Sequence, residues 1–192
     1  MDEDIFDLPR QEHFDSLGND YDLWTHKSFA LFRSAKAIES ACGRVPRDQK
    51  DAQEVFEWVE MHGVSRMLRG MAFECLFKAL WLAYGGTLAD KGKYRGIPGA
   101  RDHDLCSLEG KVAERVDTGL NSKERRLLAR LSFFIMYGRY PIRKSMAEQY
   151  PSAPDSDKPV YWCRWTPEDD KVLEEVTNKL QQLIKSRYAI ND

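Results

Sequence analysis

The fold of this chain is decided by residues 71–84, which read Met71-Ala-Phe-Glu-Cys-Leu-Phe-Lys-Ala-Leu-Trp-Leu-Ala-Tyr84. Only Glu74 and Lys78 are charged in this stretch. A helix that is apolar nearly all round is expected inside a bundle rather than on its surface. Because Glu74 and Lys78 stand four residues apart, they share one helix face and can form an ion pair. The pair either anchors a core helix or lines a polar cavity in which a ligand binds.

Apolar residues recur at helical spacing in most of the remaining chain, and few segments alternate with period two. The chain is therefore predicted to be an all-α, up-and-down bundle of five or six helices. Thr166-Pro167-Glu168-Asp169 has the form of a helix N-terminus, and Asp102 or Asp104 can cap an earlier helix. The expected helices cover residues 21–42, 48–84 as one helix or as two that separate at Gly63, 104–116, 121–137 and 167 onward.

The segments between these helices have the composition of loops. Residues 1–19 are polar and are expected to form a loose N-terminal arm, and residues 20–192 one domain. Residues 86–101 contain four glycines and are expected to form a flexible surface loop. Residues 140–165 contain four prolines and predict a long structured loop, in which any strand would be short or at an edge.

Composition excludes several classes of protein. The acidic start of the chain and the lack of a long apolar run indicate a cytoplasmic protein without a membrane span. The four cysteines lie far apart and are expected to be buried, reduced thiols, with no metal or cofactor site. Residues 1–60 carry 14 acids against 7 bases, whereas residues 91–144 carry 13 bases against 6 acids. The basic middle can meet phosphate or an acidic partner, or it can simply be a solvated surface.

Three short patterns occur in helix order: Glu74-x-x-x-Lys78, Asp102-His103-Asp104-Leu105 and Tyr137-Gly138-Arg139-Tyr140-Pro141. In this order the chain resembles the HEPN superfamily over roughly residues 20–142. The resemblance implies a small helical bundle, usually a homodimer, of the kind found in prokaryotic defence and toxin–antitoxin systems and beside nucleotidyltransferases. Many members are metal-independent RNases, whose signature is an arginine followed by a histidine after four to six intervening residues.

This chain departs from that signature. Arg95 precedes His103 with seven residues between, and no histidine follows Arg139. RNA cleavage without a metal requires an acid or base that moves the proton of the 2′-hydroxyl, and a cation that stabilises the phosphorane. His103, oriented by Asp102 or Asp104, could supply the first, and Arg139 could supply the second. The more ordinary interpretation is that both are structural, with His103 bonded at a helix start and Arg139 bonded to helix carbonyls or to Glu74.

The sequence thus favours a HEPN-like module that is catalytically degenerate and binds RNA, a nucleotide or a partner protein as a homodimer, with an antitoxin or nucleotidyltransferase as a possible partner. Glu74 and Lys78 would shape the site, His103 would exchange hydrogen bonds or protons, and Arg139 with Arg143 would hold an anion. The alternative is a metal-independent endoribonuclease that uses His103 and Arg139 as catalytic residues. A third interpretation is an adaptor whose basic middle meets an acidic protein. The aromatic residues around Trp165 could stack on bases or pack into the core.

Overall fold

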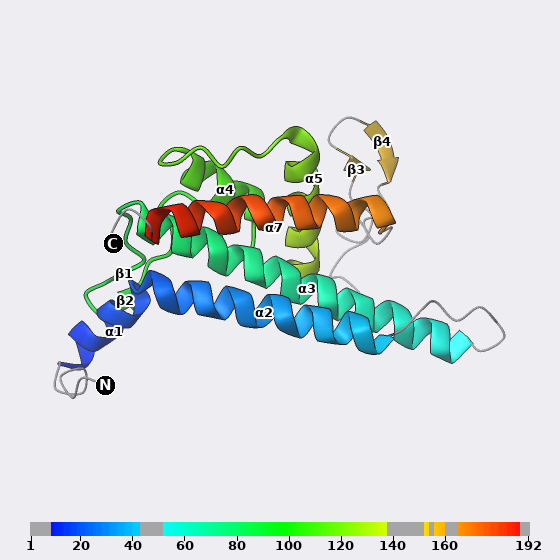
Figure 1. Ribbon diagram of the computed structural model, residues 1–192, viewed down its shortest axis with the longest axis horizontal. Coiled ribbons are helices and arrows are strands. Elements are labelled where there is room, and N and C mark those ends of the chain that lie inside the picture. The colour runs from blue at the N-terminus through cyan, green and yellow to red at the C-terminus, as the bar shows by residue number, and fades with distance from the viewer. Residues whose placement is uncertain (1–8, 43–51, 138–151, 154–155, 160–164, 189–192) are drawn as a thin grey trace.

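A computed structural model describes residues 9–42, 52–137, 152–153, 156–159 and 165–188. The described residues form an all-α bundle, as predicted (Figure 1). The helices are α1 (Arg10–Gly18), α2 (Tyr21–Cys42), α3 (Ala52–Ala83), α4 (Leu105–Ala113), α5 (Ser122–Tyr137) and α7 (Pro167–Tyr188). Four short strands form two antiparallel pairs, β1 (Ala89–Asp90) with β2 (Lys93–Tyr94) and β3 (Ser152–Ala153) with β4 (Ser156–Pro159).

Helix α3 is the centre of the bundle. It packs against α2, α4, α5 and α7, with α2 and α7 running alongside it and α5 crossing behind (Figure 1). The stretch that decides the fold occupies its second half, where Phe73, Leu76, Phe77 and Leu80 are fully buried. Apolar residues of α4, α5 and α7 complete the same core, among them Leu108, Leu131 and Val176. The apolar stripes read from the sequence are therefore the packed faces.

The expected break at Gly63 does not occur. Helix α3 continues through this position for 32 residues. A glycine inside a helix costs only about 1 kcal/mol relative to alanine. Packing of α2 along α3 offsets this cost, for example through the hydrogen bond from Ser65 Oγ to Glu39 Oε1 at 2.5 Å. The glycine is visible in the sequence, but the packing of α2 against α3 is not.

Part of the expected N-terminal arm is ordered. Residues 10–18 form α1, and the short helix is tied to the β1–β2 hairpin. Asn19 Nδ2 donates to the oxygen of Ala89, and Asn19 Oδ1 accepts from the backbone N–H groups of Leu88 and Ala89. Asp15 likewise accepts from the N–H of Gly92. These contacts join residues about 70 positions apart, and local sequence patterns do not predict them.

The glycine-rich segment at 86–101 is not only a surface loop. It contains the β1–β2 hairpin, whose turn residues Lys91 and Gly92 both have positive φ, and it buries Leu88 and Ile97 in the core. Gly86 is required next to α3, because a Cβ here would lie 2.2 Å from the Trp81 ring. The hairpin thereby holds Tyr94 against the end of the bundle.

The predicted helix starts are confirmed. Asp104 accepts from the N–H of Ser107 at 3.1 Å and caps α4. At α7, the N–H of Thr166 donates to Asp169 Oδ2 at 2.7 Å. The described part of the proline-rich segment holds only the two short strands β3 and β4, and the rest of residues 140–165 before Trp165 lies outside the described residues.

The described cysteines, Cys42, Cys75 and Cys106, are free thiols, as predicted. All three are partly buried, whereas buried thiols were expected. Burial raises the pKa of the Cys75 and Cys106 thiols to about 11, which keeps both protonated near neutral pH. Cys163 lies outside the described residues.

Candidate functional site

Residues from four parts of the chain meet at one end of the bundle. Glu74 and Lys78 come from α3, Asp102 and His103 from the segment before α4, Trp24 from α2 and Tyr94 from β2. We call this group the acid–lysine–histidine site.

The carboxylate of Glu74 joins the two predicted motifs. Its Oε1 accepts a hydrogen bond from Lys78 Nζ at 2.6 Å, and its Oε2 lies 2.8 Å from Nδ1 of His103. The Glu74 side chain is only 9% exposed. A buried carboxylate must have its oxygens bonded, and here each oxygen has a partner. Glu74 is thus the group that fixes the relative positions of Lys78 and His103.

The ammonium of Lys78 is enclosed by acids and aromatic rings. Its Nζ lies 3.4 Å from Asp102 Oδ1 and 5.2 Å from the ring centroids of both Trp24 and Tyr94. Burial alone would lower the pKa of Lys78, but the charge of Glu74 and the hydrogen bonds to Glu74 and Tyr94 outweigh burial and raise it. Lys78 is therefore a permanently charged part of the site.

The pKa of Tyr94 is also raised, but for Tyr94 burial is the main cause. Burial raises the pKa of its hydroxyl, and the nearby charges of Asp102 and Glu74 add to this, against the opposing effect of Lys78. The phenol therefore remains neutral at physiological pH. As a neutral group next to a cation, it can act as a hydrogen-bond acceptor for Lys78 and a donor elsewhere.

His103 is the exposed member of the site. Its side chain is 47% exposed, and its backbone has φ +68°, a left-handed conformation that is uncommon for a residue other than glycine. When Nδ1 donates to Glu74, Nε2 of the neutral ring is an acceptor that faces no hydrogen-bonding partner among the described residues. The arrangement presents an imidazole whose orientation is fixed by a buried carboxylate.

The structure thus brings together three of the predicted site residues, Glu74, Lys78 and His103. Arg139 and Arg143 lie outside the described residues. The acid that orients His103 is Glu74, and not Asp102 or Asp104 as expected. Asp102 contacts Lys78 instead, and Asp104 is occupied by the cap of α4 and by an ion pair with Arg101.

Trp24 and Tyr94 were not predicted as members of this site. Tyr94 is the only aromatic residue within the glycine-rich segment 86–101, which was a usable signal. Trp24 follows the helical periodicity of α2 and carried no such signal. Its contact with Lys78 depends on how α2 packs on α3. Over the described residues, no three His, Cys, Asp or Glu side chains are grouped closely enough to hold a metal ion.

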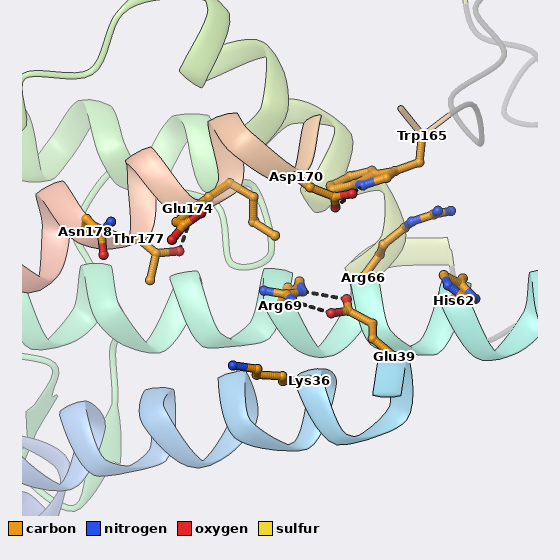
Figure 2. Close-up of a pocket in the computed structure, with 11 residues that line it drawn as sticks. Lys36, Glu39, His62, Arg66, Arg69, Trp165, Asp170, Glu174, Thr177 and Asn178 are labelled. Atoms are coloured by element: carbon orange, nitrogen blue, oxygen red, sulfur yellow. Dashed lines mark hydrogen bonds and ion pairs between the residues drawn. The ribbon is translucent and has the colours of Figure 1, made fainter. Parts of the chain in front are cut away.

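A pocket of about 510 Å³ lies elsewhere on the bundle, beside α2, α3 and α7 (Figure 2). Trp165, Arg66 and His62 stand at one end of it, and Thr177 and Asn178 at the other (Figure 2). We call it the α2–α3–α7 pocket. Its lining also includes Lys36, Glu39, Arg69, Asp170, Leu173 and Glu174.

Trp165 is the one residue of the predicted aromatic cluster that the structure describes. It packs partly against the core, and its Nε1 donates to Asp170 at 2.6 Å. The guanidinium carbons of Arg66 and Arg130 lie 4.9 Å and 5.2 Å from its ring centroid. Trp165 therefore combines core packing with contacts to two arginines.

Comparison with known proteins returns no family model, curated protein or solved structure that matches the chain. Among the described helices, none has the length and apolar character that crossing a membrane requires.

Proposed function

We propose that this chain is a HEPN-like binding module from a prokaryotic defence or toxin–antitoxin-type system, catalytically degenerate, that recognises RNA, a nucleotide or a partner protein at the acid–lysine–histidine site. Single-stranded RNA is the ligand that the family resemblance favours for a first test. Two of the three motifs that carry the resemblance contribute side chains to this one site.

The observation that carries the proposal is the position of His103. If the ion pair only anchored α3 in the core, Glu74 and Lys78 would be sufficient and no third residue would be needed. Here the same carboxylate also holds a half-exposed imidazole, on a backbone conformation that costs free energy. Neighbouring Tyr94 is 40% exposed and adds an aromatic face on which a base can stack.

The test is binding of a fluorescently labelled single-stranded RNA to the full chain, followed by anisotropy at low salt. His103→Asn is the informative variant, because asparagine tolerates the left-handed backbone that alanine would strain. We expect it to weaken binding roughly tenfold, the effect of one lost hydrogen bond to a charged ligand. His26→Asn, at an exposed position of α2, is the matched control and should leave binding unchanged. Equal affinities for both variants and the native chain would contradict the proposal.

A second candidate function, a metal-independent endoribonuclease, is favoured by the orientation of the same imidazole. With Nδ1 held by Glu74, Nε2 is the atom that would accept the proton of a 2′-hydroxyl. Incubation of the chain with RNA in the presence of a chelator tests this candidate. Cleavage that persists with chelator and is abolished in His103→Asn but not in His26→Asn would support it, whereas absence of chelator-resistant cleavage would reject it.

The proposed module acts as a homodimer. The first half of α3 exposes Phe56, Val59 and Val64, of which Phe56 is 61% exposed. Their spacing of three and eight residues places them on one side of the helix, where a second copy of the chain can cover them. An antitoxin or a nucleotidyltransferase is the further partner that the resemblance favours, and co-purification with the product of the neighbouring gene tests that.

A further inference from the structure

Two aromatic rings enclose the ammonium of Lys78, and neither ring belongs to α3. The ring centroids of Trp24 and Tyr94 lie 6.2 Å apart, and Nζ of Lys78 is 5.2 Å from each of them. A ring face attracts a cation only while the two stay within about 6 Å of each other. The site therefore requires that α2, which carries Trp24, and the β1–β2 hairpin, which carries Tyr94, are both fixed relative to α3.

Asn19, directly after α1, holds the hairpin strand that pairs with Tyr94. Its Oδ1 accepts hydrogen bonds from the backbone N–H groups of Leu88 at 2.7 Å and Ala89 at 3.1 Å. Its Nδ2 donates to the backbone oxygen of Ala89 at 2.8 Å. Ala89 is the residue opposite Tyr94 in the β1–β2 pair. One amide side chain thus supplies β1 with the hydrogen bonds that an adjacent strand would supply.

Gly18, the residue before Asn19, contacts the segments of both rings. Its backbone oxygen accepts a hydrogen bond from Trp24 Nε1 at 3.0 Å. It also lies against the hairpin, since a Cβ at this position would be 2.5 Å from the Cβ of Ala89. Gly18 and Asn19 therefore connect Trp24 to the hairpin, at the end of the bundle where α1 lies beside β1 and β2 (Figure 1).

Helix α1 adds little to the hydrophobic core. None of its residues is buried, and its main packing partners are β1 and β2. Asp15 adds a further contact of this kind, because it accepts a hydrogen bond from the N–H of Gly92 at 2.9 Å. The contacts of α1 and Asn19 thus act mainly on the position of the hairpin, and through the hairpin on Tyr94.

We propose that Asn19 is a positioning residue of the acid–lysine–histidine site, which holds Tyr94 at the Lys78 ammonium and thereby raises the affinity of the site for its ligand. The part of this inference that concerns the ligand rests on the proposed function, whereas the part that concerns the rings does not. Tyr94 is also the ring on which a base would stack, so its position affects both the internal cation and the ligand.

The resonance of the Lys78 ε-methylene group in a proton–carbon NMR spectrum tests the positions of the rings. Protons near the face of an aromatic ring are shifted upfield by its ring current. We expect the native Lys78 signal upfield of those of the exposed lysines, and Asn19→Ala should move it back toward them. Asn19→Asp keeps the two accepted hydrogen bonds and loses the donated one, so it should give an intermediate shift. An unchanged Lys78 signal in a folded Asn19→Ala chain would overturn the proposal.

Asn121 provides the matched control. Its Oδ1 also accepts from two backbone N–H groups, those of Lys123 and Glu124, at the start of α5. Asn121→Ala therefore removes hydrogen bonds of the same kind and should leave the Lys78 signal in place. An equal movement of the signal in both alanine variants would mean that it follows overall stability, and would overturn the proposal.

Gly18→Ala is a second variant at the same junction. Its added Cβ should push Ala89 away and move the Lys78 signal in the same direction as Asn19→Ala does. Gly110→Ala is its control, because nothing lies within 4 Å of a Cβ at that position. If Asn19→Ala does not fold, Asn19→Asp and Gly18→Ala decide, and a native Lys78 signal in both would overturn the proposal.

Affinity for the labelled single-stranded RNA separates this inference from the proposed function. Where the native chain binds RNA, Asn19→Ala should weaken binding severalfold and Asn121→Ala should not. Native RNA affinity in Asn19→Ala would overturn the proposal. If the native chain itself does not bind RNA, the proposed function fails, and the Lys78 signal alone decides whether Asn19 positions the rings.

Discussion

Oε2 of Glu74 lies 2.8 Å from Nδ1 of His103, while Oε1 of the same carboxylate accepts a hydrogen bond from Lys78 Nζ at 2.6 Å. The buried Glu74 side chain therefore contacts one buried residue, Lys78, and one exposed residue, His103. Lys78 is 6% exposed and depends on Glu74 for its charge balance, whereas His103 is 47% exposed and depends on Glu74 for its orientation. The effects of the two contacts can be measured separately.

Glu74→Gln should destabilise the fold by about 3–5 kcal/mol, because it leaves the buried ammonium of Lys78 without its main counter-charge. The double variant Glu74→Gln with Lys78→Met should recover much of this loss, since no buried charge remains. Urea unfolding measures both. Glu114→Gln, which breaks an exposed pair with Lys111, is the control and should change stability by less than about 1 kcal/mol. A single variant as stable as the native chain would show that the pair is not essential to α3.

The two glycines of α3 should respond in opposite directions to alanine. A Cβ at Gly70 would lie 2.6 Å from Ile135 Cγ1 and 3.1 Å from the Leu131 oxygen, so Gly70→Ala should destabilise by about 1–3 kcal/mol. At Gly63 nothing lies within 4 Å of the added Cβ, and Gly63→Ala should stabilise by about 0.5–1 kcal/mol. Denaturant midpoints of both variants test the prediction. Destabilisation by Gly63→Ala would argue against an unbroken α3.

Stability should fall at acid pH partly through Glu39. Burial alone would raise the pKa of this carboxyl, but the hydrogen bonds from Arg69 and Ser65 outweigh burial and lower it. A carboxyl whose pKa is lowered by folding adds stability above its unfolded pKa, about 4.3, and this stability is lost as pH falls through the folded value. Glu39→Gln should therefore be less stable than the native chain at pH 7, with a difference that shrinks below about pH 4.

The control for this effect is Ser65→Ala, which removes one of the two donors. It should show a smaller version of the same pH dependence in urea unfolding from pH 2 to 7. A constant difference between Glu39→Gln and the native chain across this range would mean that Glu39 does not titrate differently on folding.

The proposed homodimer is tested by the exposed apolar side chains of α3. Serine at both Phe56 and Val59 should convert a dimer to a monomer in sedimentation velocity, because the apolar area that the second copy covers is lost. Leu23→Ser is the matched control, since Leu23 is 44% exposed on α2 and does not belong to this face. A native chain that sediments as a monomer at high micromolar concentration would reject the dimer.

Helical periodicity was sufficient to predict most of the fold. The expected range 21–42 coincides with α2, and the Thr166-Pro167 signal places the start of α7 correctly. The errors concern α1, the continuity of α3 at Gly63, and the segment 86–101, which forms a hairpin and buries Leu88 and Ile97. In each case a contact with a distant segment decided the structure, such as Asn19 with Leu88 and Ala89. Such contacts leave no local pattern in a single sequence.

The candidate site could also be predicted only in part, because local sequence patterns identify some of its residues but not the contacts between distant ones. Glu74 and Lys78 identify each other by their spacing, and His103 stood out as a histidine at a helix start. The partner of His103 was not predictable, because Asp102 and Asp104 are nearer in sequence than Glu74. The positive φ of His103 turns its side chain toward α3. Of the residues that line the α2–α3–α7 pocket, only Trp165 had a sequence signal, because the others come from three helices and have ordinary spacing in each.

The uninterrupted course of α3 sets a fixed geometry between two chemically different places on the molecule. Arg66 and Glu74 belong to the same continuous helix. The distance between the α2–α3–α7 pocket and the His103 imidazole therefore cannot change when a ligand binds unless α3 bends. A compound built to touch both must therefore match that interval, and the length of its linker would matter as much as the groups at its ends.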